Sequence, residues 1–254
     1  MPCVTIDENR FFYRLSKKPH KNKKTIIFIH GSGGESSVWE HQLSGLYRSF
    51  MMVIPDLPGH GKSGGVSFST AKEAAEWINK LAESLNLSSF YLAGHSLGGA
   101  VAQEYAALFP EKTEGLVLVG TSLRFDVSKE YLDLLQRDFE KAVKVSCDRA
   151  YAGMVPQQQY KKGFEMLLKN GKNTLYQDMM ACKVFKGSDL ALSIKKPCLI
   201  ICGQEDKITR SEQSSLLSEK INNSVLDIIP GAGHMVMTEA YDTLNRAIEN
   251  FVIR

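Results

Sequence analysis

Short runs of consecutive apolar residues recur along this chain, and longer segments with helical spacing separate them. Uninterrupted apolar runs are typical of strands that are buried on both faces of a parallel sheet. Six such strands are predicted: Thr25 to Ile29, Met51 to Ile54, Phe90 to Ala93, Leu116 to Val119, Leu199 to Ile201 and Val225 to Ile229. Two shorter strands, Cys3 to Ile6 and Phe11 to Leu15, are expected before them.

Segments with apolar residues at helical spacing alternate with these strands. Helices are predicted over Val38 to Phe50, Thr70 to Leu85, Glu212 to Ile221 and Glu239 to Phe251. Thr70 and Glu73 form a capping-box pattern at the start of the second one. Because strands alternate with helices, we predict an α/β fold with a mostly parallel sheet and helices on both of its faces.

The alternation stops over residues 123–190, which contain no strand-like run. Apolar residues there recur at helical spacing instead, as in Tyr131, Leu134, Leu135 and Phe139. We interpret residues 123–190 as an inserted helical cap over the edge of the sheet. Residues 1–122 and 191–254 would then form the α/β core.

A G-x-S-x-G pentapeptide, residues 94–98, lies between the predicted strand Phe90 to Ala93 and a small-residue segment that continues to Ala106. A serine on a tight strand-to-helix turn is held in a strained conformation with its hydroxyl exposed, and the flanking glycines avoid collisions with neighbouring backbone. We therefore predict that Ser96 is a nucleophile.

A serine hydroxyl needs a base, and the base needs an orienting acid. Sheets of this kind supply both from loops after later strands, in the order Ser, acid, His. Asp206 follows the predicted strand Leu199 to Ile201, and His234 lies in a glycine-rich loop after the last strand. We predict these two as acid and base; the competing acids are Glu205, Asp189 and Asp126.

The negative charge that develops on a carbonyl oxygen requires two N–H donors. One candidate is the amide of Leu97, directly after the nucleophile. The other is the amide of Ser32, in the glycine-rich loop after the strand Thr25 to Ile29. Of the neighbouring histidines, His30 is expected to brace its loop, His60 to hold a turn, and His95 to face away from the site.

Composition and charge narrow the functional classes. The chain has 254 residues and a net charge of +3, which gives no argument for a nucleic-acid partner. The basic cluster Lys17 to Lys24 is interpreted as a solvated turn. Five scattered cysteines, without metal-ligand spacing, predict reduced thiols in a cytoplasmic protein. Neither a signal peptide nor a membrane-spanning segment is predicted.

These motifs together resemble the α/β-hydrolase superfamily, and the resemblance extends over nearly the whole chain. The motifs that carry it, in chain order, are His30-Gly31-Ser32-Gly33-Gly34, Asp56-Leu57-Pro58-Gly59-His60-Gly61-Lys62-Ser63, Gly94-His95-Ser96-Leu97-Gly98-Gly99, Gly203-Gln204-Glu205-Asp206 and Gly233-His234-Met235. The chain is similar to small bacterial serine hydrolases with a helical cap. Two turn positions depart from the family pattern: Arg210 and Tyr241 stand where relatives often have proline.

The resemblance implies a carboxylesterase-like serine hydrolase that uses a Ser96–Asp206–His234 triad and needs no cofactor or metal. Carbon–carbon bond hydrolase, lactonase, thioesterase and perhydrolase activities use the same residues and remain open, as does a ligand receptor with slow turnover. The expected partner is a small ester or acyl substrate, and the protein is expected to be a monomer or homodimer. Apolar cap residues favour a mainly apolar substrate, and Arg124 is considered as an anchor for a substrate carboxylate. Those cap residues are Tyr131, Phe139, Phe164, Met166, Met179, Met180 and Phe185.

Overall fold

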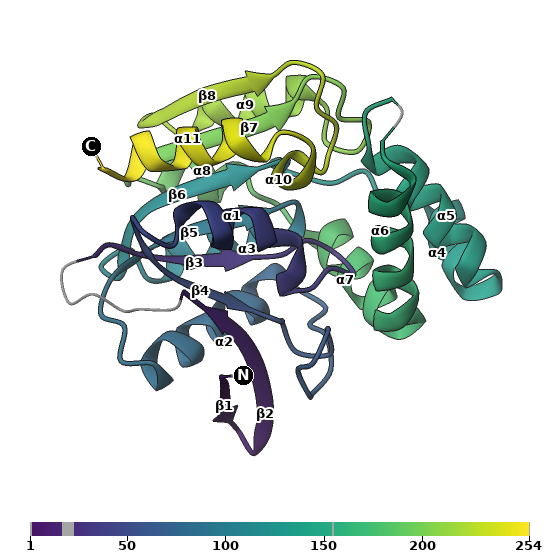
Figure 1. Cartoon of the computed structure of the whole chain (residues 1–254), viewed down its shortest axis with the longest axis horizontal. Helices are drawn as coiled ribbons and strands as arrows, with labels where there is room; N and C mark the ends of the chain where they lie inside the picture. Colours follow the sequence, from purple (N-terminus) through teal and green to yellow (C-terminus); the bar gives the residue numbers. More distant parts are fainter. Residues whose placement is uncertain (1, 17–22, 154, 254) are drawn as a thin grey trace.

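An eight-stranded sheet forms the centre of the computed structural model, which describes residues 2–16, 23–153 and 155–253 (Figure 1). Its strand order is β1-β2-β4-β3-β5-β6-β7-β8; β1 and β2 run antiparallel to their neighbours, and all other pairs are parallel. The strands are β1 (Cys3–Ile6), β2 (Asn9–Leu15), β3 (Thr25–Ile29), β4 (Met51–Pro55), β5 (Phe90–His95), β6 (Thr113–Val119), β7 (Cys198–Gly203) and β8 (Ser224–Ile229). The predicted mostly parallel sheet is confirmed.

Helices cover both faces of the sheet because the side chains of each strand alternate between the faces. Ile27 and Ile29 pack in the cluster formed with α2 (Ala71–Ser84), α3 (Leu97–Leu108), α8 (Ser188–Ser193) and α9 (Ser211–Lys220). Ile26 and Phe28 pack on the opposite side with a short 3₁₀ helix (Ser36–Trp39), α1 (Glu40–Leu46), α10 (Val236–Glu239) and α11 (Tyr241–Ile253). Two hydrophobic layers therefore fix the sheet between helices.

Two helix predictions were wrong in their extent. The segment predicted as one helix over Val38 to Phe50 is a 3₁₀ turn followed by α1, which ends at Leu46. The apolar side chains of Val38 and Trp39, which suggested a helix, pack into the core from that turn. The segment predicted as a helix from Glu239 is split between α10 and α11, since Ala240 leaves helical geometry with φ −132°.

The insert after β6 is helical, as predicted. Its helices are α4 (Lys129–Arg137), α5 (Phe139–Ala150), α6 (Gln157–Asn170) and α7 (Lys172–Val184), which stand together at one end of the sheet, on the right in Figure 1. They share a hydrophobic cluster of their own, built around Leu132, Leu135 and Val143. In contrast, α8 runs across the boundary we predicted near residue 190, and its Ala191 belongs to the core cluster under the sheet.

One sequence prediction falls partly outside the described residues. Residues 17–22 of the basic cluster are among those not described. Among the helices that are described, none combines the length and apolar character required to cross a bilayer.

Candidate active site

Ser96 occupies a strained turn between β5 and α3. Its backbone has φ 52° and ψ −118°, a conformation that a non-glycine residue adopts only when its surroundings impose it. A Cβ atom on Gly94 would lie 2.2 Å from the carbonyl oxygen of Gly98, and one on Gly98 would lie 2.4 Å from that of Ile29. Both glycines are therefore required for β5 to enter α3 so abruptly, as the pentapeptide predicted.

Asp206 and His234 lie side by side beyond the carboxyl ends of β7 and β8. Oδ2 of Asp206 is 2.7 Å from Nδ1 of His234, and both side chains are buried. Because a carboxylate only accepts, Nδ1 carries the hydrogen, and the lone pair of His234 is on Nε2. Ser96 and His234 line the same cavity, so the structure brings the three predicted residues together.

Backbone and side-chain donors hold the Asp206 carboxylate. Its Oδ1 accepts hydrogen bonds from the amides of Ile208 (2.7 Å) and Thr209 (2.9 Å), and its Oδ2 accepts one from the Thr209 hydroxyl (2.9 Å). Burial by itself would raise the pKa of Asp206, but the nearby His234 and these donors outweigh it and lower that pKa. Among the competing acids, Asp126 lines the cavity but is exposed.

Glu239 holds the loop that carries His234, a contact that sequence reasoning missed. Its carboxylate accepts hydrogen bonds from the amides of Gly233 (3.2 Å) and Met235 (3.0 Å), on either side of the histidine. It also accepts one from the amide of Ala152 (2.8 Å), which follows α5. A glutamate five positions beyond a loop histidine, just before the last long helix, was the only available sequence signal.

The two predicted oxyanion donors are backbone amides without an acceptor among the described residues. Leu97 is the first residue of α3, where helix amides have no intrahelical partner. Ser32 lies in the loop after β3 and lines the cavity that holds Ser96. Both amides are therefore available to an oxygen atom bound near the serine.

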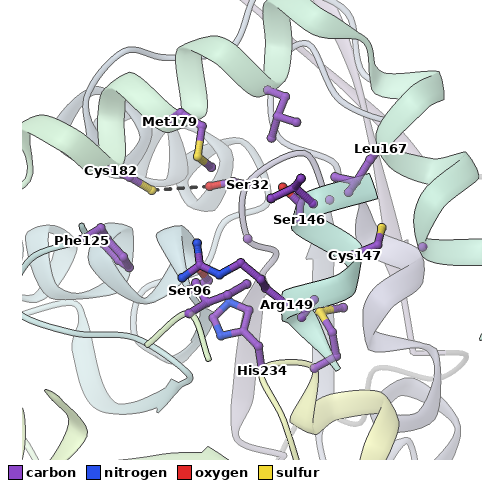
Figure 2. A pocket seen from close by; sticks show the side chains of 18 of the residues that line it. Ser32, Ser96, Phe125, Ser146, Cys147, Arg149, Leu167, Met179, Cys182 and His234 are labelled. Atoms are coloured by element: carbon purple, nitrogen blue, oxygen red, sulfur yellow. Dashed lines mark hydrogen bonds between the residues drawn. The ribbon is translucent and has the colours of Figure 1, made fainter. Parts of the chain in front are cut away.

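A cavity of about 220 Å³ lies between the sheet and the cap (Figure 2). Of the cap residues predicted to select the substrate, Tyr131, Met166 and Met179 line it. The others serve packing: Phe139, Phe164 and Met180 join the cap cluster, and Phe185 joins the core. The remaining apolar lining includes Phe125, Val127, Leu167 and Leu175.

Arg149, not Arg124, is the arginine of this cavity. Arg124 is exposed and is not part of the cavity lining. The side chain of Arg149 extends from α5 toward Ser96 and His234 in Figure 2, and its guanidinium donates to the carbonyl oxygen of Lys207 at 2.9 Å. No local sequence pattern pointed to Arg149, because its position depends on how α5 packs over the core.

His95 does not face away from the site, contrary to our prediction. Its Nε2 is 3.0 Å from the carbonyl oxygen of His234, the two rings lie 4.5 Å apart, and His95 lines the cavity. Burial and the neighbouring His234 lower the pKa of His95 well below its ordinary value. Neutral His95 therefore holds the His234 loop through this hydrogen bond.

No cluster of three or more metal-ligating side chains occurs in the described part of the chain.

Comparisons with known proteins agree on a fold and a broad activity. Residues 26–247 match the model of the alpha/beta hydrolase family. The structure of a thermophilic esterase is 31% identical, with a TM-score of 0.87 over 99% of this chain and 96% of that one. A pimeloyl-[acyl-carrier protein] methyl ester esterase from Wigglesworthia glossinidia brevipalpis is 28% identical over 88% of this chain and 90% of its own. An enol-lactonase from Burkholderia xenovorans LB400 (TM-score 0.93, 20% identity, full coverage of both chains) shares the fold.

Proposed function

Because this chain belongs to the alpha/beta hydrolase family and is an esterase-like hydrolase, we propose that it cleaves a carboxylic ester through an acyl-enzyme. The observation that carries the proposal is the 2.7 Å contact between Asp206 and His234 in the same cavity as the strained Ser96. A serine with a paired base and two free amides nearby fits acyl transfer.

In the proposed first half-reaction, Ser96 Oγ attacks the ester carbonyl carbon while His234 Nε2 accepts the hydroxyl proton. Asp206 stabilises the imidazolium that forms and keeps the ring in the required tautomer. The amides of Ser32 and Leu97 donate to the oxyanion of the tetrahedral intermediate. The intermediate collapses when the alcohol leaves with the proton from His234, and the acyl group stays on Ser96.

The second half-reaction repeats these steps with water. His234 removes a proton from the water molecule, whose oxygen attacks the acyl carbon. The second tetrahedral intermediate uses the same two amides, and its collapse returns the proton to Ser96 and releases the acid. Apart from the ester and this water molecule, every group that acts in the two half-reactions belongs to the chain.

The cavity supports a mainly apolar acyl or alcohol group of modest size. Its volume of about 220 Å³ lies below the roughly 300–1,000 Å³ of drug-sized ligand sites, and most of its lining is apolar. We therefore expect short and medium chains to be preferred over long ones. The five cysteines are all free thiols, which supports the proposed cytoplasmic location.

The test is hydrolysis of p-nitrophenyl esters from acetate to decanoate by the wild type and the Ser96→Ala variant. Turnover near one per second on some chain length, reduced by about 10³-fold or more in Ser96→Ala, supports the proposal. Ser84→Ala removes an exposed serine on α2 and serves as the matched control, with unchanged activity expected.

A wild type that barely exceeds Ser96→Ala on every ester would contradict simple esterase action. Carbon–carbon bond hydrolysis, lactone or thioester hydrolysis, perhydrolysis and slow-turnover ligand binding would then be tested with the same pair of proteins. Labelling by a fluorophosphonate, read by mass spectrometry at Ser96, separates an unreactive serine from an unsuitable substrate.

A further inference from the structure

A buried carboxylate–imidazole pair joins the cap to the core beside the proposed oxyanion site. Oδ2 of Asp178, on α7, lies 2.9 Å from Nε2 of His60, in the loop after β4. Both residues are almost fully buried, although 118 positions separate them along the chain. The esterase reaction proposed above does not use either side chain directly.

The hydrogen bonds of His60 require a charged ring. Its Nδ1 lies 2.9 Å from the carbonyl oxygen of Pro58, and its Nε2 faces the Asp178 carboxylate, so both nitrogens must donate. Burial opposes this charge, but Asp178 and the two hydrogen bonds outweigh burial and raise the pKa of His60. The neighbouring His30 accepts from the Leu57 amide at Nε2 and is neutral, with its pKa lowered by burial to about 4.

The Asp178 carboxylate also binds the loop that contains Ser32. Its Oδ2 accepts a hydrogen bond from the amide of Gly33 at 2.6 Å, and its Oδ1 accepts one from the Ser67 hydroxyl. A second cap residue, Asn170 at the end of α6, donates to the carbonyl oxygens of Gly33 (2.8 Å) and Gly34 (2.9 Å). The loop after β3 is thus held by two side chains of the cap.

Hydrogen bonds to the carbonyl oxygen of Gly31 orient the Ser32 amide, because both belong to the same peptide group. The carbonyl oxygen of Gly31 accepts hydrogen bonds from the Gly34 amide (3.0 Å) and from Nδ1 of His30 (2.9 Å). In a trans peptide the C=O and N–H point in opposite directions, so the Ser32 N–H faces away from these partners. The φ of +63° at Gly33 turns the chain so that the Gly34 amide returns to the Gly31 carbonyl oxygen while the Gly33 amide donates to Asp178.

We propose that Asp178 and His60 are positioning residues for the oxyanion hole, so that the cap completes a site whose donors belong to the core. The proposal rests on the proposed function, in which the Ser32 amide stabilises the oxyanion. Charged His60 keeps the buried Asp178 ionised, and the ionised carboxylate fixes the Gly33 amide. The orientation of the preceding Ser32 amide follows from the fixed loop.

The charge of Asp178 is what an amide side chain cannot replace. An asparagine at position 178 keeps the shape, and its NH₂ group can donate to the Ser67 hydroxyl, but its uncharged oxygen would have to accept from both the Gly33 amide and the charged ring of His60. The buried charge of His60 would then lose its counter-ion, and the loop would relax toward other arrangements. A displaced oxyanion donor affects the transition state, where charge develops on the oxygen, more than it affects the bound ester.

The test compares the wild type with Asp178→Asn on the best p-nitrophenyl ester. We expect kcat to fall about 10-fold to 100-fold while KM changes less than about threefold. The affinity for an alkyl boronic acid, which forms a tetrahedral adduct with the serine, should fall in proportion to kcat/KM. Asp133→Asn, which removes an exposed carboxylate from α4, is the matched control and should match the wild type.

Asn170→Ala provides the same test if Asp178→Asn does not fold. It removes two hydrogen bonds to the loop after β3 and the acceptor of the Gly61 amide, retains both side chains of the Asp178–His60 pair, and should lower kcat by a smaller factor with the same unchanged KM. The proposal is overturned if folded variants keep the wild-type kcat, or if KM rises and kcat does not change. An inactive Ser96→Ala together with a fully active Asp178→Asn would contradict this inference alone, whereas an active Ser96→Ala would contradict the proposed function.

Discussion

Nδ1 of His234 lies 2.7 Å from Oδ2 of Asp206, and the Thr209 hydroxyl lies within 3.2 Å of the same nitrogen while donating to the same carboxylate oxygen at 2.9 Å. These contacts fix both the tautomer and the plane of the imidazole ring. They also keep Asp206 ionised in a buried position, because every hydrogen-bond donor around it favours the charged form.

Asp206→Asn should preserve the fold and remove most of the activity. The amide NH₂ can donate to Nδ1 and thereby place the imidazole hydrogen on Nε2, where it cannot accept the serine proton. We expect kcat to fall by roughly 10³- to 10⁴-fold, by the reasoning established for Ser-His-Asp enzymes in general. Steady-state kinetics on the best ester checks this, with circular dichroism to verify folding; a loss of less than tenfold would contradict the role of Asp206.

Gly120→Ala should impair the site as well as the fold. Gly120, at the end of β6, has φ +52°, and a Cβ atom there would lie 3.3 Å from His234 Nδ1 and 3.5 Å from Asp206 Oδ2. The positive φ alone should cost about 1 kcal/mol of unfolding free energy. The added crowding should also displace His234 and lower kcat.

Gly153→Ala is the control that separates these two effects. Gly153 has a similar φ of +47°, but a Cβ atom there would meet no atom within 4 Å. Gly153→Ala should lose a similar amount of unfolding free energy, measured by urea-induced unfolding, and should keep the wild-type kcat. Equal kcat values for the two alanine variants would show that the His234–Asp206 pair tolerates the contact.

The stabilisation that the Asp178–His60 pair provides should depend on pH in both directions. Above the ordinary His pKa of 6.5, rising pH removes the charge of His60 as it passes through its raised folded-state pKa, and the stabilisation is lost. Below the ordinary Asp pKa of 3.8, falling pH protonates Asp178 as it passes through its lowered folded-state pKa. Asp56 also raises the pKa of His60, and the neutral ring of His30 packs against it at 4.7 Å.

Urea unfolding of the wild type and Asp178→Asn at several pH values checks this expectation. The difference in unfolding free energy should be largest between about pH 4 and 6.5 and should decrease on either side. Asp133→Asn should give a difference near zero that does not vary with pH. A difference for Asp178→Asn that is constant from pH 4 to 10 would contradict a charged pair.

Arg149 should favour an ester that carries a carboxylate over a neutral ester of the same length. Arg149 lines the cavity, and its guanidinium uses one of its donors on the carbonyl oxygen of Lys207, which leaves others for a substrate. Because the side chain is exposed, the preference should be modest, about fivefold or less in kcat/KM. Arg149→Gln should abolish it and Arg137→Gln on α4 should not; an equal preference in both variants would exclude Arg149 as its source.

Local sequence patterns were sufficient for the strands, the nucleophile turn and the acid–base loops. Ser96 was predictable because its strain is imposed by neighbours in the chain, Gly94 and Gly98. Asp206 and His234 were predictable because parallel strands place their carboxyl ends at one edge, so residues after β7 and β8 must meet there. The split of the first predicted helix was not predictable, since the apolar Val38 and Trp39 fit a helix and a core-facing 3₁₀ turn equally well.

Local sequence was thus enough to predict the sheet, the family resemblance and the residues proposed for the chemistry, because each depends on neighbours in the chain or on the end of a strand. The surroundings of these residues became visible only in the folded chain: Asp178 and Asn170 contact the Ser32 loop, Glu239 holds the His234 loop, and Arg149 lines the cavity. Those contacts depend on how helices of the cap pack over a sheet to which they are joined only at their ends. Packing of that kind is set by the fit of whole surfaces, which no short stretch of sequence records.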